Sequence, residues 1–216
     1  MTKNLNALFL VTLIFATLSE IRADVLVGPI LFEESKYFLL TNSTWTEAEQ
    51  EAQRMGGHLA TIETVEENIF VFRTFSEYDN VERNLWIGLN DFLIEGLFLW
   101  SSGTISEYEN FAPGEPTNLF DEDFVHIWYP SVINPDGCWN NAPDIINISN
   151  RPCHGVVELP FLLGDVNQDG AVDLLDVEPF VELLSSEKFL LEADINKDGI
   201  VDLLDVGPFV DLLLNS

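Results

Sequence analysis

The sequence predicts an α+β domain followed by a small all-α domain. Two helical patterns near the N-terminus precede short strand-like runs that are separated by long loops, as expected for an α+β fold. Near the C-terminus, a twelve-residue pattern rich in Asp occurs twice, and an amphipathic run follows each copy. The chain has 216 residues, of which 47% are hydrophobic, so it can supply a core for each domain.

Residues 1–23 have the layout of a secretory signal peptide. Lys3 precedes an apolar run from Ala7 to Leu18, and Ala23 provides a small residue for cleavage. The apolar run is shorter than the ~20 residues that a transmembrane helix requires. We therefore expect residues 1–23 to be removed and the mature protein to be secreted without a membrane span.

The net charge limits the classes of partner. The formal net charge at pH 7 is −28. Nucleic acids and anionic membranes are bound through a basic face, so we expect neither partner here. An excess of acids instead fits cation binding and a solvated extracellular surface.

Two helix starts can be placed from their capping residues. Thr44 precedes Glu47 by three residues, which is a capping-box signature, and Thr64 stands in the same relation to Glu67. A Gly pair at residues 56–57 is expected to end the first helix. Upstream of that helix, a strand is predicted over residues 37–40. The residues expected on the buried side of the second helix are Ile69, Phe70, Phe72 and Phe75.

Between residues 86 and 141, tryptophans alternate with groups of side-chain oxygens on turn-like segments. The motifs are WIGLND at 86–91, EG at 95–96, Trp100, GEPTN at 114–118, DED at 121–123 and WNN at 139–141. Few cations accompany these oxygens, and Ca2+ takes six to eight oxygen ligands. The grouping favours metal binding, and the alternative is a set of acidic, solvated loops.

The order of these motifs resembles the C-type lectin domain. The resemblance extends upstream to GGHLATI at 56–62 and downstream to GVVE at 155–158, and it covers roughly residues 29–160. It implies a domain over residues 24–160 with two helices, short antiparallel strands and long loops. It also implies that sugar is bound through Ca2+, although many members of this fold bind no sugar.

The resemblance implies a Ca2+ site that also binds sugar. The matching residues are Glu115, Thr117, Glu122, Asn140 and Asn141. Thr117 replaces an amide ligand and Asn141 replaces a carboxylate, so the site has fewer charges and a weaker expected affinity for Ca2+. Asn118 is an alternative source of the missing carbonyl. The same loop is expected to contain a cis peptide bond before Pro116.

An auxiliary Ca2+ site is implied as well. Its matching residues are Asp91, Glu95, Asn118 and Asp123, together with the backbone carbonyl of Glu122. Three carboxylates remain in this set, so it is expected to bind metal more reliably than the sugar site. In total, zero to two Ca2+ ions are expected in this domain.

Cys138 and Cys153 are the two cysteines of the chain, and each precedes a strand-like run. One disulfide between neighbouring strands is therefore plausible in an oxidising compartment. The chain departs here from animal C-type lectins, which usually carry two disulfides. Ala52 and Val157 replace one cysteine pair, and Phe124 replaces a cysteine of the other.

The expected places of the other aromatic residues and of the histidines follow from residue type and neighbouring sequence. Trp86 and Trp100 are expected in the core, because large aromatic side chains dominate small cores. Trp128 and Tyr129 are better candidates for an exposed surface. The three histidines carry no partner pattern and are interpreted as structural: His58, His126 and His154.

The C-terminal repeat consists of two Ca2+-binding loops, and the second begins 29 residues after the first (194 − 165 = 29). Positions 1, 3, 5, 9 and 12 supply side-chain oxygens, position 7 a backbone carbonyl, and position 6 is Gly. The ligands of the first loop are Asp165, Asn167, Asp169, Ala171, Asp173 and Asp176. Those of the second loop are Asp194, Asn196, Asp198, Ile200, Asp202 and Asp205. We therefore expect two Ca2+ ions here.

Each loop leads into an amphipathic helix. Pro179 and Pro208 lie early in these helices and should make them start near Val177 and Val206. The apolar stripes expected to pack against each other are Val177, Phe180, Val181 and Leu184, and Val206, Phe209, Val210 and Leu213. The loop-helix duplication resembles a type I dockerin over residues 164–216. We assign a domain at 161–216, with repeats at 165–184 and 194–213.

The dockerin resemblance implies a cohesin-like protein partner. Loop positions 10 and 11 are the family's contact positions, and they are Leu174-Leu175 and Leu203-Leu204 here. The near-perfect repeat would offer two equivalent binding faces. The alternative is a Ca2+-stabilised terminal domain in which these leucines are all core.

These observations together predict a secreted, Ca2+-dependent carbohydrate-binding protein. The dockerin-like domain would attach it to an extracellular assembly, such as one that degrades polysaccharide. The alternative is a protein-binding adhesin that needs no Ca2+ at the sugar site. We expect no enzyme activity, because no residues remain for a catalytic domain once the two domains are assigned.

Overall fold

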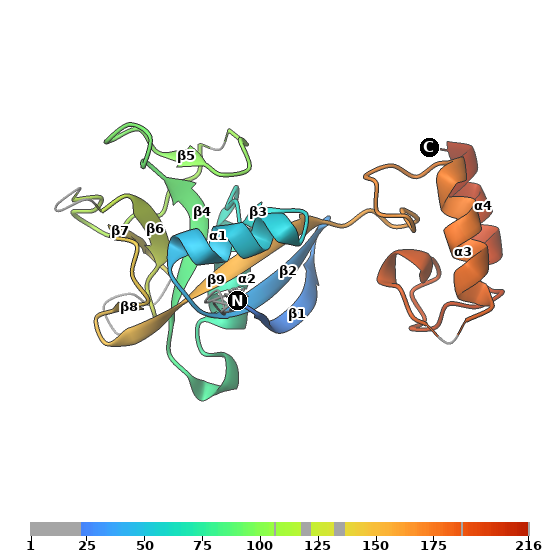
Figure 1. The fold of residues 1–216 in the computed structure, drawn as a ribbon, viewed down its shortest axis with the longest axis horizontal. Coiled ribbons are helices and arrows are strands. Elements are labelled where there is room, and N and C mark those ends of the chain that lie inside the picture. Colours follow the sequence, from blue (N-terminus) through green and yellow to red (C-terminus); the bar gives the residue numbers. More distant parts are fainter. Residues whose placement is uncertain (1–22, 106, 118–121, 132–136, 187, 216) are drawn as a thin grey trace, which may run out of the picture.

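The computed structural model describes residues 23–105, 107–117, 122–131, 137–186 and 188–215 (Figure 1). Asn118 and nearly all of the expected signal peptide lie outside these ranges. Figure 1 shows a mixed α/β part and, after a short link, a helical tail. No helix in the described ranges is long and apolar enough to cross a membrane.

The first helix, α1 (Trp45–Arg54), begins where the sequence predicts. The Thr44 side chain accepts a hydrogen bond from the Glu47 amide, and the Glu47 carboxylate accepts one from the Thr44 amide. The capping box is therefore present. Met55 closes the helix and Gly56 follows with φ of +92°, a conformation that favours glycine.

The second helix, α2 (Val65–Phe75), also begins as predicted, with the Thr64 side chain accepting from the Glu67 amide. Its buried side is only partly the predicted one. Phe72 and Phe75 are buried, but Ile69 and Phe70 are half-buried and Val71 takes a core position. The helical register turns Val71 inward, and Phe70 instead stacks on the aromatic ring of Phe32 at the edge of the core.

The sheet crosses the domain between the two helices. Its strands are β1 (Val25–Phe32), β2 (Ser35–Asn42), β3 (His58–Leu59), β4 (Asn84–Asn90), β5 (Leu99–Trp100), β6 (Phe124–Ile127), β7 (Trp139–Ala142), β8 (Asn147–Ile148) and β9 (Arg151–Pro160). The main order is β1-β2-β9-β4-β6-β7. Most strand pairs are antiparallel, as expected, and β4 and β9 pair in parallel. The long connection between them allows the crossover that parallel pairing requires.

The two faces of the sheet carry separate cores. Leu39 and Leu40 are neighbours in β2 but point to opposite faces, as strand geometry requires. One face packs on α2 and includes Trp100 and Trp139, and the other packs on α1 and includes Trp86. Trp86 and Trp100 are buried, which confirms that they are core residues.

The predicted disulfide is absent from the structure, in which Cys138 and Cys153 are not joined. Cys153 lies in β9 and Cys138 immediately precedes β7, and the strands β4 and β6 separate them in the sheet. Neighbouring strands are about 4.8 Å apart, so this separation far exceeds the ~7 Å between α-carbons that a disulfide allows. Burial raises the pKa of the Cys153 thiol to about 12.

The tail contains a pair of helices side by side in Figure 1, α3 (Val177–Leu184) and α4 (Val206–Asn215). Both start at the residues predicted from Pro179 and Pro208. Short 3-10 turns precede the first helix and the second loop, at Leu174–Asp176 and Leu191–Ala193. The rings of Phe180 and Phe209 form the centre of the tail's core.

The predicted apolar stripes are only partly buried. Phe180 and Phe209 are buried, and Val177, Leu184, Val206 and Leu213 are half-buried against them. Val181 and Val210 are exposed, contrary to the prediction. Two short helices bury only one narrow line of contact, so the outer edge of each stripe faces solvent.

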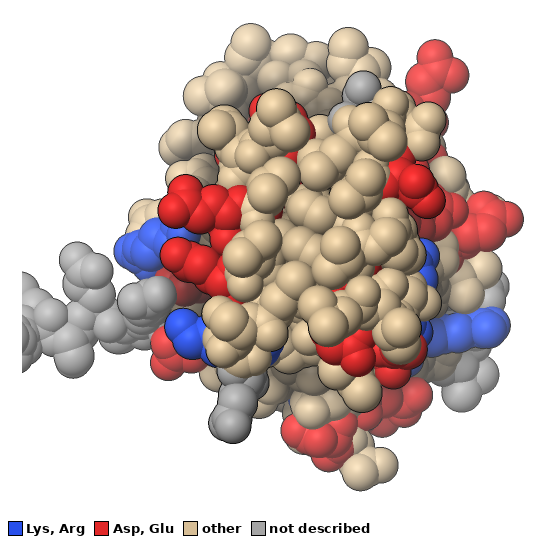
Figure 2. Space-filling model, turned by 90° about the vertical axis from the view of Figure 1, so that its right-hand side faces the viewer, with Lys and Arg blue, Asp and Glu red and all other residues tan. Residues whose placement is uncertain are grey.

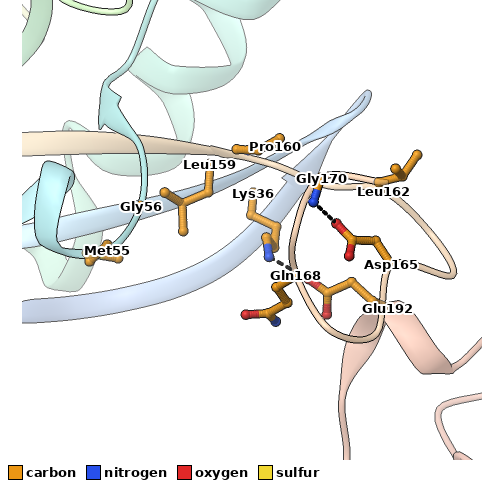
Figure 3. Close-up of a pocket in the computed structure, with 10 residues that line it drawn as sticks. All are labelled: Lys36, Met55, Gly56, Leu159, Pro160, Leu162, Asp165, Gln168, Gly170 and Glu192. Atoms are coloured by element: carbon orange, nitrogen blue, oxygen red, sulfur yellow. Dashed lines mark hydrogen bonds and ion pairs between the residues drawn. The ribbon is translucent and has the colours of Figure 1, made fainter. Parts of the chain in front are cut away.

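The two domains touch, as the short link between them predicts. The Lys36 ammonium on β2 lies 2.5 Å from the carboxylate of Glu192, just ahead of the second Ca2+ loop. The Phe161 amide, in the link, donates to the carbonyl of Glu34. Figure 3 shows this junction and a small pocket beside it, lined by Lys36 and Leu159 from one side and Asp165 and Glu192 from the other.

Candidate calcium and ligand sites

The first loop of the tail is closed by its first and last carboxylates. The Asp165 carboxylate accepts hydrogen bonds from the amides of Asp169 and Gly170, at 3.1 and 2.9 Å. The Asp176 carboxylate accepts from the amides of Asn167 and Asp173, both at 2.9 Å. Both carboxylates are buried and face the centre of the loop.

The second loop repeats the same bonds at an offset of 29 residues. Asp194 accepts from the amides of Asp198 and Gly199, at 3.1 and 2.9 Å. Asp205 accepts from the amides of Asn196 and Asp202, at 3.0 and 2.9 Å. The glycine at position 6 has φ of +90° in the first loop and +87° in the second, so the sharp turn predicted there is present.

These loops fit Ca2+ by their chemistry. Each one buries two carboxylates, which is costly unless a cation or hydrogen bonds compensate the charge. In the described ranges, no three His, Cys, Asp or Glu side chains are drawn together tightly enough to mark a metal site, and backbone amides satisfy the buried carboxylates. The side-chain atoms offered at positions 1, 3, 5, 9 and 12 are oxygens, and this donor set suits Ca2+.

The leucines at loop positions 10 and 11 are exposed, so they are not core residues. Leu174, Leu175, Leu203 and Leu204 have exposed fractions between 65% and 80%. Figure 2 views the molecule from the tail side of Figure 1 and shows a broad uncharged surface with acidic groups around it. The alternative in which all four leucines are core is therefore wrong.

Three of the expected sugar-site residues lie together in the loop before β6. The Thr117 hydroxyl donates to the Glu122 carboxylate at 2.9 Å, and the Thr117 amide donates to the Glu115 carboxylate at 3.0 Å. The peptide bond between Glu115 and Pro116 is cis, as predicted. The structure thus places two carboxylates and a hydroxyl at one accessible point, a donor set that suits Ca2+.

Asn141 joins this loop to the sheet. Its side chain is buried, and its Nδ2 atom donates to the backbone carbonyl of Glu122 at 2.7 Å. Asn141 therefore holds the carboxylate-bearing loop against β7. The side chain of Asn140 points to the other face of this strand.

Asn140 lies next to His126, which the sequence predicts to have only a structural role. Its Nδ2 atom lies 3.4 Å from Nε2 of His126, its cross-strand partner on β6. His126 is completely buried, and burial lowers the pKa of its imidazole to about 4. A neutral ring with its proton on Nδ1 accepts from Asn140, which directs the Asn140 oxygen away from the ring. No spacing in the sequence signals this pair, because it depends on strand register.

The expected auxiliary site is partly assembled. The Asp91 amide donates to the carbonyl of Asp123 at 3.0 Å, so these residues are adjacent. Asp91 is buried and its carboxylate accepts from the Gly96 amide at 2.8 Å. Glu95 is exposed on the same loop, and Asn118 lies outside the described residues. The backbones of Asp91 and Asp123 are thus adjacent, but among the described residues the three carboxylates of this set are not drawn together into a metal site.

Trp128 and Tyr129 do not form an open platform. Both are half-buried, and the guanidinium of Arg151 lies 4.9 Å from the centre of the Tyr129 ring. The expectation that they form an exposed surface is wrong, because β9 brings Arg151 over this ring.

Comparison with known proteins agrees with this division of the chain. Residues 41–145 match the family model described as the lectin C-type domain, and residues 163–207 match the dockerin type I domain. Over 111 residues, half of this chain, the sequence is 37% identical to the versican core protein of Rattus norvegicus. The human C-type mannose receptor 2 is 36% identical over 102 residues. The chain spans only 4% and 6% of these two proteins.

Solved structures show the same fold. The cow C-type carbohydrate-recognition domain of CD23, in the presence of GlcNAc2Man3 oligosaccharide, matches with a TM-score of 0.50 and 26% identity. That match covers 62% of this chain and 93% of the other. A calcium-independent type II antifreeze protein matches with a TM-score of 0.51 and 21% identity over 66% of this chain and 99% of its own, which supports the fold alone.

Proposed function

The chain carries a C-type lectin domain, matched at residues 41–145, and a dockerin type I domain, matched at residues 163–207, and on that premise we propose a secreted protein that binds carbohydrate with Ca2+. The dockerin domain would attach it to a cohesin-like protein of an extracellular assembly, such as one that degrades polysaccharide. The proposed role is binding, since both matched families are binding domains.

The observation that carries the carbohydrate proposal is the gathering of Glu115, Thr117 and Glu122 at one accessible point. Asn140 and Asn141, on β7, are the other residues of the expected set, and their side chains lie on opposite faces of that strand. A bound Ca2+ would supply coordination to a pair of sugar hydroxyls. Glu115 and Glu122 would hold that metal and accept hydrogen bonds from the sugar hydroxyls, and Asn141 fixes the loop to the sheet.

The test is a glycan-array screen of the full chain with Ca2+ and with chelator, beside the variants Glu115→Gln and Glu77→Gln. Glu77 is exposed in the segment after α2, so its variant controls for a general loss of negative charge. We expect Ca2+-dependent binding that Glu115→Gln abolishes and Glu77→Gln retains. Glycan binding that is retained in Glu115→Gln would show that the sugar is bound elsewhere than at this loop.

A protein-binding adhesin is the second candidate. The replacement of an amide by Thr117 and of a carboxylate by Asn141 favours it, because both changes remove Ca2+ ligands of the sugar site. Absence of binding to any glycan by a folded protein, as judged by circular dichroism, would support this candidate over the first.

The exposed leucine pairs carry the docking proposal for the tail. Leu174 and Leu175 stand at positions 10 and 11 of the first loop, and Leu203 and Leu204 at the same positions of the second, and all four are exposed. Exposed apolar side chains ringed by polar groups are typical of protein interaction sites. Their equivalent positions in the two repeats suggest two alternative faces for one partner.

A further inference from the structure

The segment that follows β4, up to the first residue of β5, exposes apolar side chains that neither proposed site uses. Five large apolar residues here have exposed fractions between 47% and 78%, namely Phe92, Leu93, Ile94, Leu97 and Leu99. We refer to these five residues as the apolar loop. A contiguous apolar surface of this kind is uncommon on a protein without a partner.

Hydrogen bonds hold the apolar loop in this conformation. The Asp91 carboxylate accepts from the Gly96 amide at 2.8 Å, and the Asp91 carbonyl accepts from the Ile94 amide at 3.1 Å. The Leu97 amide donates to the carbonyl of Ile94 at 2.9 Å. The acidic residue is therefore buried while the apolar ones face solvent, which reverses the usual preference.

A groove with an aromatic floor lies beside the apolar loop. It encloses about 360 Å³ between the loop and α1, and Trp45, Trp100 and Phe124 form its floor. Phe124 stacks between Trp45 and Phe92, with ring centroids 4.5 and 6.0 Å away. Such a groove accommodates one or two apolar or aromatic side chains.

The charge around the groove indicates what can occupy it. Glu95 is exposed on the apolar loop, whereas Glu49, the charged residue of the lining, is buried and already bonded to His58 and to the Leu59 amide. Lys and Arg contribute nothing to the lining. A second copy of this chain carries the same net charge of −28, so self-association would be repelled, as would an anionic bilayer.

We propose that the apolar loop and its groove bind a protein segment that inserts apolar side chains and places Lys or Arg at the rim. None of the residues that line the groove is an expected sugar ligand or a leucine of the tail's exposed pairs. The protein would therefore hold a second protein partner through its lectin domain, independently of glycan binding and of docking by the tail.

The test is a selection of short random peptides, displayed on phage, for binding to the full chain. We expect enriched clones with apolar anchors flanked by Lys or Arg, whose affinity falls at least about tenfold for the double variant Leu93→Ser/Leu97→Ser. Ile105→Ser is the matched control, because Ile105 is 93% exposed but lies outside the groove. Leu93→Lys should weaken the same clones by repelling their cations, and higher salt should weaken them by screening.

Three results would overturn the proposal. The first is a selection in which no clone distinguishes the parent from the double variant. The second is that the parent and the Ile105→Ser control bind phosphatidylcholine vesicles and the double variant does not. This result would assign the surface to lipid. The third is that the parent and the Ile105→Ser control dimerise with increasing concentration in sedimentation equilibrium and the double variant does not. This result would assign the surface to a second copy of the chain.

Discussion

Phe180 and Phe209 occupy equivalent places in the two repeats of the tail, and their rings stack with centroids 4.1 Å apart and planes 26° apart. Each ring is almost completely buried by the other repeat. The tail's core is thus a contact between two copies of one unit, neither of which can bury its own phenylalanine.

Phe209→Ala should unfold the tail at Ca2+ concentrations that keep the parent folded. Truncating a buried Phe costs about 3–5 kcal/mol, and a domain this small has little more than that in reserve. Isothermal titration calorimetry should show a weaker apparent Ca2+ affinity, because binding must also drive folding. Val210→Ala, one residue away but exposed, is the control and should leave the affinity close to that of the parent.

Chelation of Ca2+ should unfold the tail and leave the lectin domain folded. The tail's four buried loop carboxylates lose their proposed counter-ions, whereas the lectin domain has two apolar cores that need no metal. Scanning calorimetry should show that chelator removes one transition and retains the other. Loss of both domains in a single cooperative step would contradict this view.

Partner docking by the tail should tolerate the loss of one leucine pair but not of both. Leu174→Asp/Leu175→Asp should leave the face at Leu203 and Leu204 intact and reduce affinity by no more than a few-fold. The variant in which all four leucines are replaced by Asp should lose binding to a cohesin-like partner altogether. Pull-down and surface plasmon resonance would measure both, with Ca2+ binding by calorimetry as the control for folding.

His126 should act as a neutral acceptor for Asn140 throughout the range from pH 5 to pH 8. Burial lowers the pKa of His126 to about 4, so its NMR titration should have a midpoint near that value. His126→Phe removes the acceptor and should weaken Ca2+-dependent glycan binding, and His126→Gln, which can still accept a hydrogen bond, should partly restore it. Equal glycan binding by the parent, His126→Phe and His126→Gln would show that His126 does not contribute to the site.

The same shift has a consequence for stability. The pKa of His126 lies below that of a histidine in the unfolded chain, so the unfolded state binds the extra proton between about pH 6.5 and pH 4. The stabilisation is therefore complete above pH 6.5 and is lost as the pH falls to 4, by roughly 3 kcal/mol in the limit. Denaturant unfolding of His126→Phe should show a correspondingly flatter dependence on pH in this window.

Local signals in the sequence predicted helix starts well. The capping residues Thr44 and Thr64 and the prolines Pro179 and Pro208 place four helix starts, because each acts on a backbone group within a few residues. The cis bond before Pro116 followed from the family resemblance and was confirmed. The predicted side of α2 was less accurate, since small changes in register exchange Phe70 for Val71.

Long-range relationships were not predictable in this way. The cysteines were assigned to neighbouring strands, but the order of strands in the sheet puts β4 and β6 between them. The contact of His126 with Asn140 depends on the same strand order and register. Neither can be read from spacing, because each depends on which strands pair and in what register.

The calcium loops combine features that the local sequence predicts with surfaces that only the folded structure shows. Ligand types, their spacing and the glycine turn are contained in twelve consecutive residues, so the chain itself defines where each ion can bind and where each helix begins. The surfaces offered to partners needed the folded molecule. Whether Leu174, Leu93 or Val181 faces solvent is decided by what the rest of the chain places against it, and burial is a property of the assembled packing.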